Sequence, residues 1–206
     1  MTSQREDLFS CVCNEDAEAL RQLLQDEDEM RNQLLSRTDE AGRSALMVGG
    51  LLGRTAAVKT LATHGAEVNQ QTLRGYTALH FASCWGHVET VRALLKLGAD
   101  TKIQNFRGER PVDLARKYSR PDCEKCLLVG EAEQDFTSYL DHVKDVISES
   151  ETSLTKEERN LSSRVLAAKT TWLQTVTGAE VLHYKNQRRD LDDSLQHILN
   201  KLANAQ

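Results

Sequence analysis

Two pairs of cysteines have spacings that metal sites and redox sites use. Cys123 and Cys126 are separated by two residues, and Cys11 and Cys13 by one. Two such pairs, brought together in a folded chain, could bind zinc through four thiolates. His80 is a second candidate, because an imidazole can act as a general base near neutral pH. The elements that carry these side chains decide whether either chemistry can occur.

A glycine-rich stretch, GGLLGRT at residues 49–55, has some features of a phosphate-binding loop. However, its glycines are one residue too close, an arginine replaces the lysine, and no buried strand precedes it. We therefore expect Gly53 to form a turn between two helices and Gly49 and Gly50 to lie within the first of them. A glycine inside a helix costs about 1 kcal/mol relative to alanine, so this segment is expected to be less stable than its neighbours.

The chain repeats itself with a period of 33 residues. A shift by this period aligns glycines with glycines and apolar residues with apolar residues. The matched positions are Gly42, Gly75 and Gly108; Leu46 and Leu79; Gly53 and Gly86; Val58 and Val91; Leu61 and Leu94; and Gly65 and Gly98. The register continues, weakened, to Leu127, and backward through residues 8–26 across a longer linker. We therefore predict four consecutive units of one repeated structure.

Each unit has the pattern of two short helices. In the third unit, Gly75 suits a tight turn, Thr77 can cap a helix that begins at Ala78, and Gly86 allows the turn into a second helix. The apolar residues recur at helical spacing; they are Leu79, Ala82, Val91, Leu94 and Leu95. Because one helix pair cannot bury this face alone, the units are expected to stack on one another.

Residues 75–100 resemble the ankyrin repeat through the patterns G-x-T-x-L-H, A-x-x-x-G-H and L-L-x-x-G-A-D. The resemblance implies a solenoid over residues 5–130, and non-catalytic binding of protein partners. It also implies that His80 makes a structural hydrogen bond between neighbouring turns, rather than acting as a base. The expected repeats cover about residues 5–38, 39–71, 72–104 and 105–130.

The repeat register also accounts for the cysteines. Cys11 falls on the position of Ala82, and Cys126 on that of Ala93, where a helix pair accepts a small side chain. Free cysteine packs as a small hydrophobe, so we interpret these residues as packing or partly exposed positions. A metal or redox site remains the alternative.

Composition narrows the functional classes. The 206 residues carry a net charge of -5, which argues against nonspecific binding to nucleic acid. The number of cysteines, five, fits a reducing compartment better than a secreted disulfide framework. No stretch has the length and hydrophobicity of a membrane span or a signal core, so a cytosolic protein is expected. The acidic run QDEDE at residues 25–29 is interpreted as a solvated loop rather than a calcium site. No catalytic motif or cofactor motif is recognised, and we expect neither an enzyme nor a cofactor.

Residues 131–206 lack the repeat and instead predict three helices in a small bundle, which makes the whole chain all-α. Thr155 with Glu158 has the pattern of a capping box, and Gly178 separates the second helix from the third. The expected core positions are Phe136, Tyr139, Leu140, Val143, Ile147, Trp172, Leu173, Val181, Tyr184, Leu191, Leu195, Ile198 and Leu202.

The segments LTKEERN, WL, AEVLHYKNQRRDLD and ILNKL resemble the C-terminal helical lid of seventy-kilodalton heat-shock chaperones, over residues 134–202. His197 stands where that lid usually has proline. The chaperone ATPase domain, peptide-binding β-sandwich and acidic tail have no counterpart here, so ATP-driven folding is not implied.

The combination of ankyrin repeats with a lid-like bundle, together with the segments RGYT, NFRGER and ARKYS, resembles one family of ankyrin proteins. This resemblance implies a cytoplasmic, non-enzymatic protein with a role in cell division, at the midbody and cleavage furrow, or in ciliated cells. The main function is thus expected to be an interaction scaffold with a role in cell division or in cytoskeletal or ciliary organisation. The alternatives are a chaperone-linked regulator that acts through the bundle, and an enzyme built from scattered residues.

Ankyrin stacks usually bind proteins on their concave side, through hairpin tips and the ends of first helices. The register assigns to this predicted partner surface Leu73, Arg74, Tyr76, Trp85, Phe106, Arg107, Glu109 and Tyr118. Tryptophan, tyrosine and arginine dominate binding hot spots, so we predict a protein-binding site here. The alternative is that the C-terminal bundle folds back and buries these residues.

Asn69 lies in LATHGAEVN, with leucine eight residues before it, an acid two before and valine one before. This pattern resembles ankyrin substrates of the oxygen-sensing asparaginyl hydroxylase, which makes Asn69 a candidate hydroxylation site. An asparagine that only stabilises a turn is the alternative.

Overall fold

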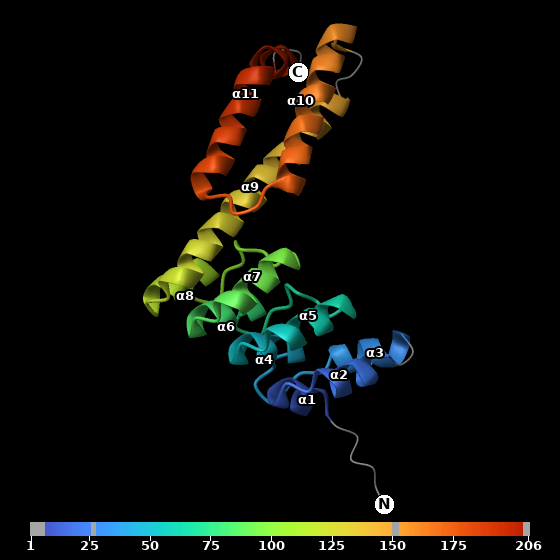
Figure 1. Ribbon diagram of the computed structural model, residues 1–206, viewed down its shortest axis with the longest axis vertical. Coiled ribbons are helices and arrows are strands. Elements are labelled where there is room, and N and C mark those ends of the chain that lie inside the picture. The colour runs from blue at the N-terminus through green and yellow to red at the C-terminus, as the bar shows by residue number, and fades with distance from the viewer. Residues whose placement is uncertain (1–6, 26–27, 150–152, 204–206) are drawn as a thin grey trace, which may run out of the picture. The chain divides into compact units, whose positions relative to one another are not determined.

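The protein is helical throughout the part that the structure describes. The computed structural model describes residues 7–25, 28–149 and 153–203. These stretches contain eleven helices and no strand, which confirms the expected all-α fold class (Figure 1).

The chain divides into two compact units, Met1–Leu128 and Val129–Gln206. The sequence-based division lies two residues later, between residues 130 and 131. Each unit has its own cluster of buried apolar side chains. The two units therefore have separate cores, and we describe each by itself.

Four helix pairs build the first unit, as the repeat period predicts. Each first helix packs on the next first helix, and the second helices α2, α5 and α7 do the same. This stacking buries the apolar face that a single pair would expose. The pairs are α1 (Leu8–Asn14) with α2 (Ala17–Leu24), α4 (Ala45–Leu52) with α5 (Thr55–Thr63), α6 (Ala78–Trp85) with α7 (Val88–Lys96), and α8 (Pro111–Lys117) with the first turns of α9 (Pro121–Glu149).

The third pair has the local structure that its sequence predicts. The Thr77 hydroxyl accepts a hydrogen bond from the His80 amide at the start of α6, and Gly86 ends that helix in the left-handed conformation. Leu79 and Ala82 from α6 meet the α7 side chains in the core, and all are at most 1% exposed. The buried α7 side chains of this set are Val91 and Leu94.

The two glycines inside α4 allow close packing of helices, and the lower stability expected of this segment stays a prediction. A Cβ atom on Gly50 would lie 2.7 Å from the Ala78 carbonyl oxygen, and one on Gly49 would lie 2.9 Å from a Val58 methyl carbon. The cost of about 1 kcal/mol for glycine relative to alanine therefore does not apply at these positions, because an alanine side chain would not fit there. Gly53 ends α4, as expected, so the stretch is a packed helix and its turn rather than a phosphate-binding loop.

One helix lies where the sequence predicts only a linker. The helix α3 (Asp28–Leu35) occupies much of the long connection between the first two pairs. The expected solvated loop at residues 25–29 is therefore wrong from residue 28 onward, while residues 26 and 27 lie outside the described part. The segment is rich in good helix formers, and Leu35 is buried in the core of the first unit.

The first helix of the predicted bundle does not start near residue 131. Instead α9 begins at Pro121 as the second helix of the fourth pair and continues to Glu149. Its early residues Cys123 and Leu127 belong to the core of the first unit. Later residues of α9 belong to the core of the second unit. No proline interrupts the helix between these two parts, because the only proline of the segment is its first residue, and Gly130 lies inside the helix without ending it.

The second unit is built from the rest of α9 with α10 (Lys156–Thr175) and α11 (Val181–Ala203). The predicted capping box is present, since Thr155 accepts from the Glu158 amide and the Glu158 carboxylate accepts from the Thr155 amide at 2.7 Å. The buried side chains of the second core are Phe136, Leu140, Val143, Ile147, Leu154, Tyr184, Leu191, Leu195, Ile198 and Leu202. Most of the positions expected from the apolar pattern are thus buried, and the aromatic ring of Trp172 packs edge-on against Phe136 and Tyr184.

Candidate functional site

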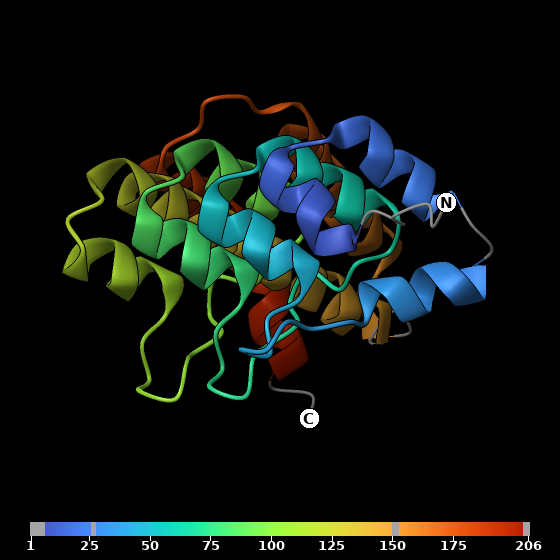
Figure 2. The same ribbon diagram turned by 90° about the horizontal axis from the view of Figure 1, so that it is seen from below.

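Two hairpin tips of the first unit, residues 72–76 and 105–109, carry most of the predicted partner surface. Each tip is closed by two backbone hydrogen bonds, of which the outer ones join Thr72 N to Tyr76 O at 2.9 Å and Asn105 N to Glu109 O at 3.0 Å. The tips project from the same side of the stacked helices (Figure 2). A tight turn leaves no room to bury its two apical side chains, so these side chains extend into solvent.

The two tips are joined directly to each other. The Phe106 amide donates a hydrogen bond to the Arg74 carbonyl oxygen at 2.9 Å. Gly75 allows this approach, because a Cβ atom there would lie 3.0 Å from Asn105 Cα, and its φ of +74° also favours glycine. The tips therefore form one continuous surface rather than two independent loops.

Arginine and aromatic side chains gather where the tips meet. The guanidinium carbon of Arg74 lies 5.8 Å from the centroid of the Phe106 ring, and that of Arg107 lies 5.1 Å from it. Both distances are within the range of cation–π attraction. Leu73, at the apex of the first tip, is fully exposed, and Phe106 is 57% exposed. We call Leu73, Arg74, Phe106 and Arg107 the hairpin-tip surface.

Tyr76 lies at the edge of this surface and is half-buried. Its ring stacks on Phe81 with a centroid distance of 5.6 Å and meets the edge of the His80 ring at 5.7 Å. The Tyr76 and Phe106 ring centroids are 6.3 Å apart. The Tyr76 ring therefore lies between the surface residue Phe106 and the α6 residues His80 and Phe81. The repeat register alone does not predict this position.

Trp85 and Tyr118 lie at the ends of α6 and α8, and both are exposed, at 57% and 48%. In the described part of the chain, no ring contact or hydrogen bond joins the Trp85 side chain to the hairpin-tip surface. Tyr118 is connected through its neighbour, because the Lys117 ammonium lies 5.9 Å from the Tyr118 ring and 2.6 Å from a Glu109 carboxylate oxygen. The structure thus brings six of the eight predicted residues together on the two tips. In this described part, Trp85 makes no such contact with them, and Tyr118 is linked to the second tip only through Lys117.

Glu109 is held in the second tip by two partners. Lys117 and the Asn105 amide both donate to its carboxylate, and these hydrogen bonds hold the pKa of Glu109 below its ordinary value. Asn105 is itself buried, and its side-chain oxygen accepts from the Arg107 and Glu109 amides. Sequence reasoning missed Asn105, although an asparagine before a glycine-containing turn is a recognisable turn signal.

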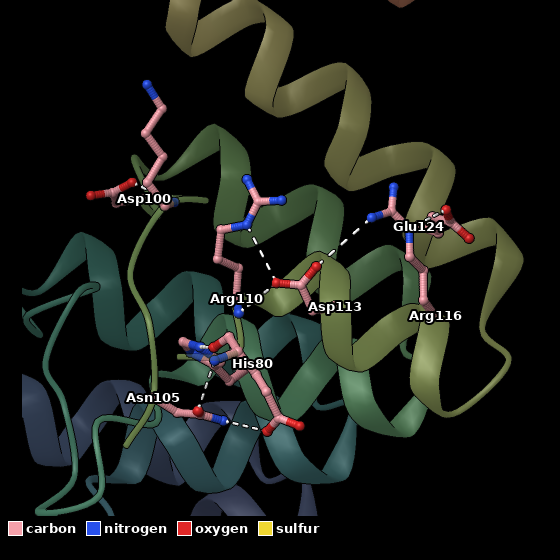
Figure 3. Close-up of polar contacts among 9 residues, drawn as sticks. His80, Asp100, Asn105, Arg110, Asp113, Arg116 and Glu124 are labelled. Carbon is pink, nitrogen blue, oxygen red and sulfur yellow. Dashed lines mark hydrogen bonds and ion pairs between the residues drawn. The ribbon is translucent and has the colours of Figure 1, made fainter. Parts of the chain in front are cut away.

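His80 is a structural residue, as its position in the repeat predicts. Its Nδ1 accepts the Thr77 amide hydrogen at 3.1 Å, which leaves the proton on Nε2, and Nε2 donates to the Glu109 carbonyl oxygen at 3.1 Å. The ring is fully buried, and burial lowers the pKa of His80. His80 therefore joins the third repeat to the second tip as a neutral imidazole without access to substrate (Figure 3).

A second polar group surrounds the start of α8. The Arg110 amide donates to an Asp113 carboxylate oxygen at 2.9 Å, and the other oxygen of this carboxylate lies 3.8 Å from Arg116. Arg116 also donates to Glu124 in α9 at 2.7 Å (Figure 3). These charges neutralise one another, in contrast to the arginines of the hairpin-tip surface.

Three of the five cysteines occupy packing positions, whereas Cys13 is exposed and Cys84 is half-buried. Cys11 and Cys123 are buried in the core of the first unit, and Cys126 packs against it. Burial raises the pKa of the Cys123 thiol to about 11 and also raises that of Cys126, so the thiolate form needed for redox or metal chemistry is disfavoured. No group of three or more metal-ligating side chains lies together among the described residues.

Asn69 connects two neighbouring turns. Its side-chain amide donates to the Gly98 carbonyl oxygen at 3.1 Å, and its side-chain oxygen accepts from the Asp100 amide at 2.8 Å. The turn-stabilising role is therefore present in the folded protein. Hydroxylation of Asn69 stays a prediction.

Comparisons with known proteins agree with this architecture. The model of the family described as "Ankyrin repeats (3 copies)" matches residues 8–105 and 53–139. A protein of Danio rerio named ankyrin repeat domain-containing protein 45 is 33% identical over 213 residues, which cover all of this chain and 95% of the relative. A protein of the same name from Homo sapiens is 32% identical over 209 residues, covering 98% of this chain and 79% of the relative. Among the described helices, none combines the length and hydrophobicity needed to cross a membrane.

Proposed function

Because the chain belongs to the ankyrin repeat family, whose stacked helix pairs support protein interaction, we propose that it is a non-catalytic scaffold that binds a protein partner through its predicted partner surface. This surface comprises the hairpin-tip surface together with Tyr76, Trp85, Glu109 and Tyr118. Ankyrin repeat proteins are generally non-catalytic, and the buried His80 and the high-pKa Cys123 described above agree with such a role.

The observation that carries this proposal is the exposure of large apolar side chains on one group of repeat positions. The described residues include eight exposed large apolar or aromatic side chains, and four of them belong to the predicted partner surface. Those four are Leu73, Trp85, Phe106 and Tyr118. Side chains of these types, next to arginines, are the ones that contribute most to protein interfaces.

A double substitution tests the proposal. Trp85→Ala with Phe106→Ala removes two exposed rings without touching the repeat core, so the variant should fold with an unchanged melting temperature. Proximity labelling in dividing and in ciliated cells should then show a set of neighbours that the wild type has and the variant lacks. Leu182→Ala is the matched control, because Leu182 is an exposed apolar side chain of the second unit. Unchanged neighbours in the double variant would contradict the proposal, and a loss of folding would indicate that these rings are buried internally.

The proposal extends to a cytoplasmic role in cell division, at the midbody and cleavage furrow, or in cytoskeletal or ciliary organisation. Its support is the resemblance of the whole sequence to one family of ankyrin proteins. Imaging of the tagged chain through mitosis and in ciliated cells tests it. A uniform distribution at every stage and in every cell type would argue against this role.

A cavity in the second unit favours a second candidate, a chaperone-linked regulator that acts through the lid-like bundle. The cavity has a volume of about 380 Å³ and is lined mainly by apolar residues of α9 and α11. These lining residues are Tyr139, His142, Val143, Val146, Leu199, Leu202 and Ala203. An apolar cavity of this kind could accept a hydrophobic side chain of a chaperone or of an unfolded client.

The half-buried Val146 and Leu199 allow a test of the second candidate on the full chain. Val146→Glu and Leu199→Glu would place charge in the cavity, and each should abolish binding to a purified seventy-kilodalton chaperone or to an unfolded client if the bundle is the binding module. Binding that survives both substitutions, or that is lost only with the Trp85/Phe106 variant, would assign the interaction to the repeats instead.

A further inference from the structure

Two arginines of the hairpin-tip surface lack acidic partners. Arg74 and Arg107 are 33 residues apart, so they occupy the same position in consecutive repeats. Neither side chain forms an ion pair or donates a hydrogen bond within the described residues. The acid nearest to Arg107 in sequence, Glu109, is already bound by Lys117 at 2.6 Å and by Asn105 at 2.9 Å, and Arg107 acts on its carboxylate only through space. On a chain with a net charge of -5, this is a local surface of uncompensated positive charge.

The two guanidinium groups are nevertheless held in place. Both lie within 5.8 Å of the Phe106 ring centroid, and cation–π attraction restrains them there. This contact uses the electrostatic field of the ring and leaves the N–H donors of each guanidinium available. An arginine with free donors in a planar arrangement is suited to carboxylate binding.

The surface between the arginines is apolar and preorganised. Phe106 is 57% exposed and Leu73 is fully exposed, so an apolar side chain of a partner could be buried against both. The backbone bond between the two tips and the close approach at Gly75 fix their relative position. A binding surface that is rigid before binding loses less conformational entropy when a partner arrives.

We propose that the hairpin-tip surface binds an acidic peptide segment of a partner protein, in which two carboxylates pair with Arg74 and Arg107 and an apolar side chain packs on Phe106 and Leu73. This inference rests on the proposed function, because it specifies the chemistry of the partner at the same surface. Two singly charged carboxylates match the two separate guanidinium charges one for one.

The spacing of the acidic residues follows from the geometry of the surface. Since both guanidinium carbons lie within 5.8 Å of one ring centroid, they cannot be farther apart than twice that distance. An extended chain advances about 3.3 Å per residue, so at most three residues span this separation. The bound segment should therefore contain two acidic residues no more than three positions apart, with an apolar residue beside or between them.

Selection from a displayed library of random dodecapeptides against the full chain provides the first test. Enriched peptides should carry the paired acidic residues and the neighbouring apolar residue, and they should bind less tightly at high salt because exposed ion pairs are screened. Enrichment of uncharged or basic peptides, or a selection without acidic binders, would overturn the inference.

Substitutions then test the assignment to the two arginines. Arg74→Gln and Arg107→Gln should each weaken binding of a selected acidic peptide by about tenfold, as expected for the loss of one hydrogen-bonded charge pair. Arg92→Gln is the matched control, because this exposed arginine of α7 pairs with Glu89 and lies outside the surface. Equal affinity of wild type and both glutamine variants would overturn the inference.

A charge exchange gives the sharpest test. The doubly substituted chain with Arg74→Glu and Arg107→Glu should reject the acidic peptide and bind a version in which lysines replace its two acidic residues. A phosphoserine version of the peptide distinguishes a phosphate site, since binding of that version alone would overturn the assignment to carboxylates. If acidic peptides fail while cellular neighbours still depend on Trp85 and Phe106, the acidic-peptide inference is wrong and the proposed scaffold function stands.

Discussion

His80 illustrates how burial gives one side chain a structural rather than a catalytic role. Its two ring nitrogens have different partners, with Thr77 in the same repeat and Glu109 in the next. Both bonds require the neutral ring with its proton on Nε2. Burial lowers the pKa of His80, so this state is the one present at neutral pH.

We predict that His80→Gln lowers the free energy of unfolding by about 1–3 kcal/mol, because buried partners of the ring lose hydrogen bonds. The variant should also change the pH dependence. The pKa of His80 is lower in the folded chain than its ordinary value of 6.5, so below that pH the unfolded chain takes up a proton that the folded chain does not. Wild-type stability should therefore fall as the pH decreases from 7.5 to 5.5, and fall less in the variant. Urea unfolding at several pH values measures this, and identical slopes would contradict the assignment.

At the level of single residues, the sequence predicted the role of His80 but not the environment of Tyr76. The repeat motif specifies the histidine because its partners lie at fixed positions in the repeat. The half-buried state of Tyr76 depends on Phe81 and Phe106, which come from a neighbouring helix and the next tip. Such contacts between individual side chains do not follow from a repeat period.

The helix α4 shows that helix propensity and helix packing can favour opposite residues. In an isolated helix, replacing glycine by alanine stabilises by about 1 kcal/mol. At Gly50 the new Cβ atom would instead lie 2.7 Å from the backbone oxygen of Ala78 in the next repeat. The neighbouring backbone cannot move without disturbing the stack.

We therefore predict that Gly50→Ala lowers the free energy of unfolding by about 1–3 kcal/mol, as overpacking does. Gly49→Ala is the comparison, because the closest contact of its Cβ atom would be a side-chain methyl group of Val58 rather than backbone, and it should cost less. Chemical unfolding followed by circular dichroism ranks the three proteins. A Gly50→Ala variant more stable than wild type would show that the repeats are less closely packed than described here.

The capping box of α10 gives a prediction for the second unit. Thr155→Ala removes the hydroxyl that accepts from the Glu158 amide, and it should cost about 1 kcal/mol. Thr171→Ala, exposed and near the C-terminal end of the same helix, should have little effect or stabilise slightly. A Trp85→Phe background leaves Trp172 as the single tryptophan, so its fluorescence reports on this unit. Equal destabilisation by both substitutions would mean that the cap contributes nothing specific.

The helices of the repeats were predictable because glycines, a threonine cap and apolar spacing recur with a fixed period. Neither α3 nor the early start of α9 follows from that period. The linker containing α3 occurs once, so no second copy reveals it, and its helix is stabilised partly by burial of Leu35. The repeat period ends before the bundle and therefore does not predict the continuity of α9, in which no proline follows Pro121 and Gly130 does not end the helix.

At the scale of the whole molecule, the two units are stabilised in different ways. The first depends on stacking of neighbouring repeats, in which each pair completes the core of the next. The second depends on the three long helices α9, α10 and α11. Its buried core side chains come mainly from α9 and α11, and partly buried side chains of α10 pack against them. Separate cores allow the binding surface of the repeats to keep its geometry while the second unit opens locally.

We predict that matched core substitutions will affect the two units separately. Leu61→Ala and Leu195→Ala each remove a fully buried leucine, one from each core, and each should cost about 2–5 kcal/mol. Hydrogen exchange followed by mass spectrometry should show faster exchange in α4 to α7 for Leu61→Ala, with α10 and α11 unchanged, and the reverse for Leu195→Ala. If either substitution speeds exchange in both units equally, the chain unfolds as one cooperative body, and the effects of bundle substitutions on partner binding could not be assigned to the bundle alone.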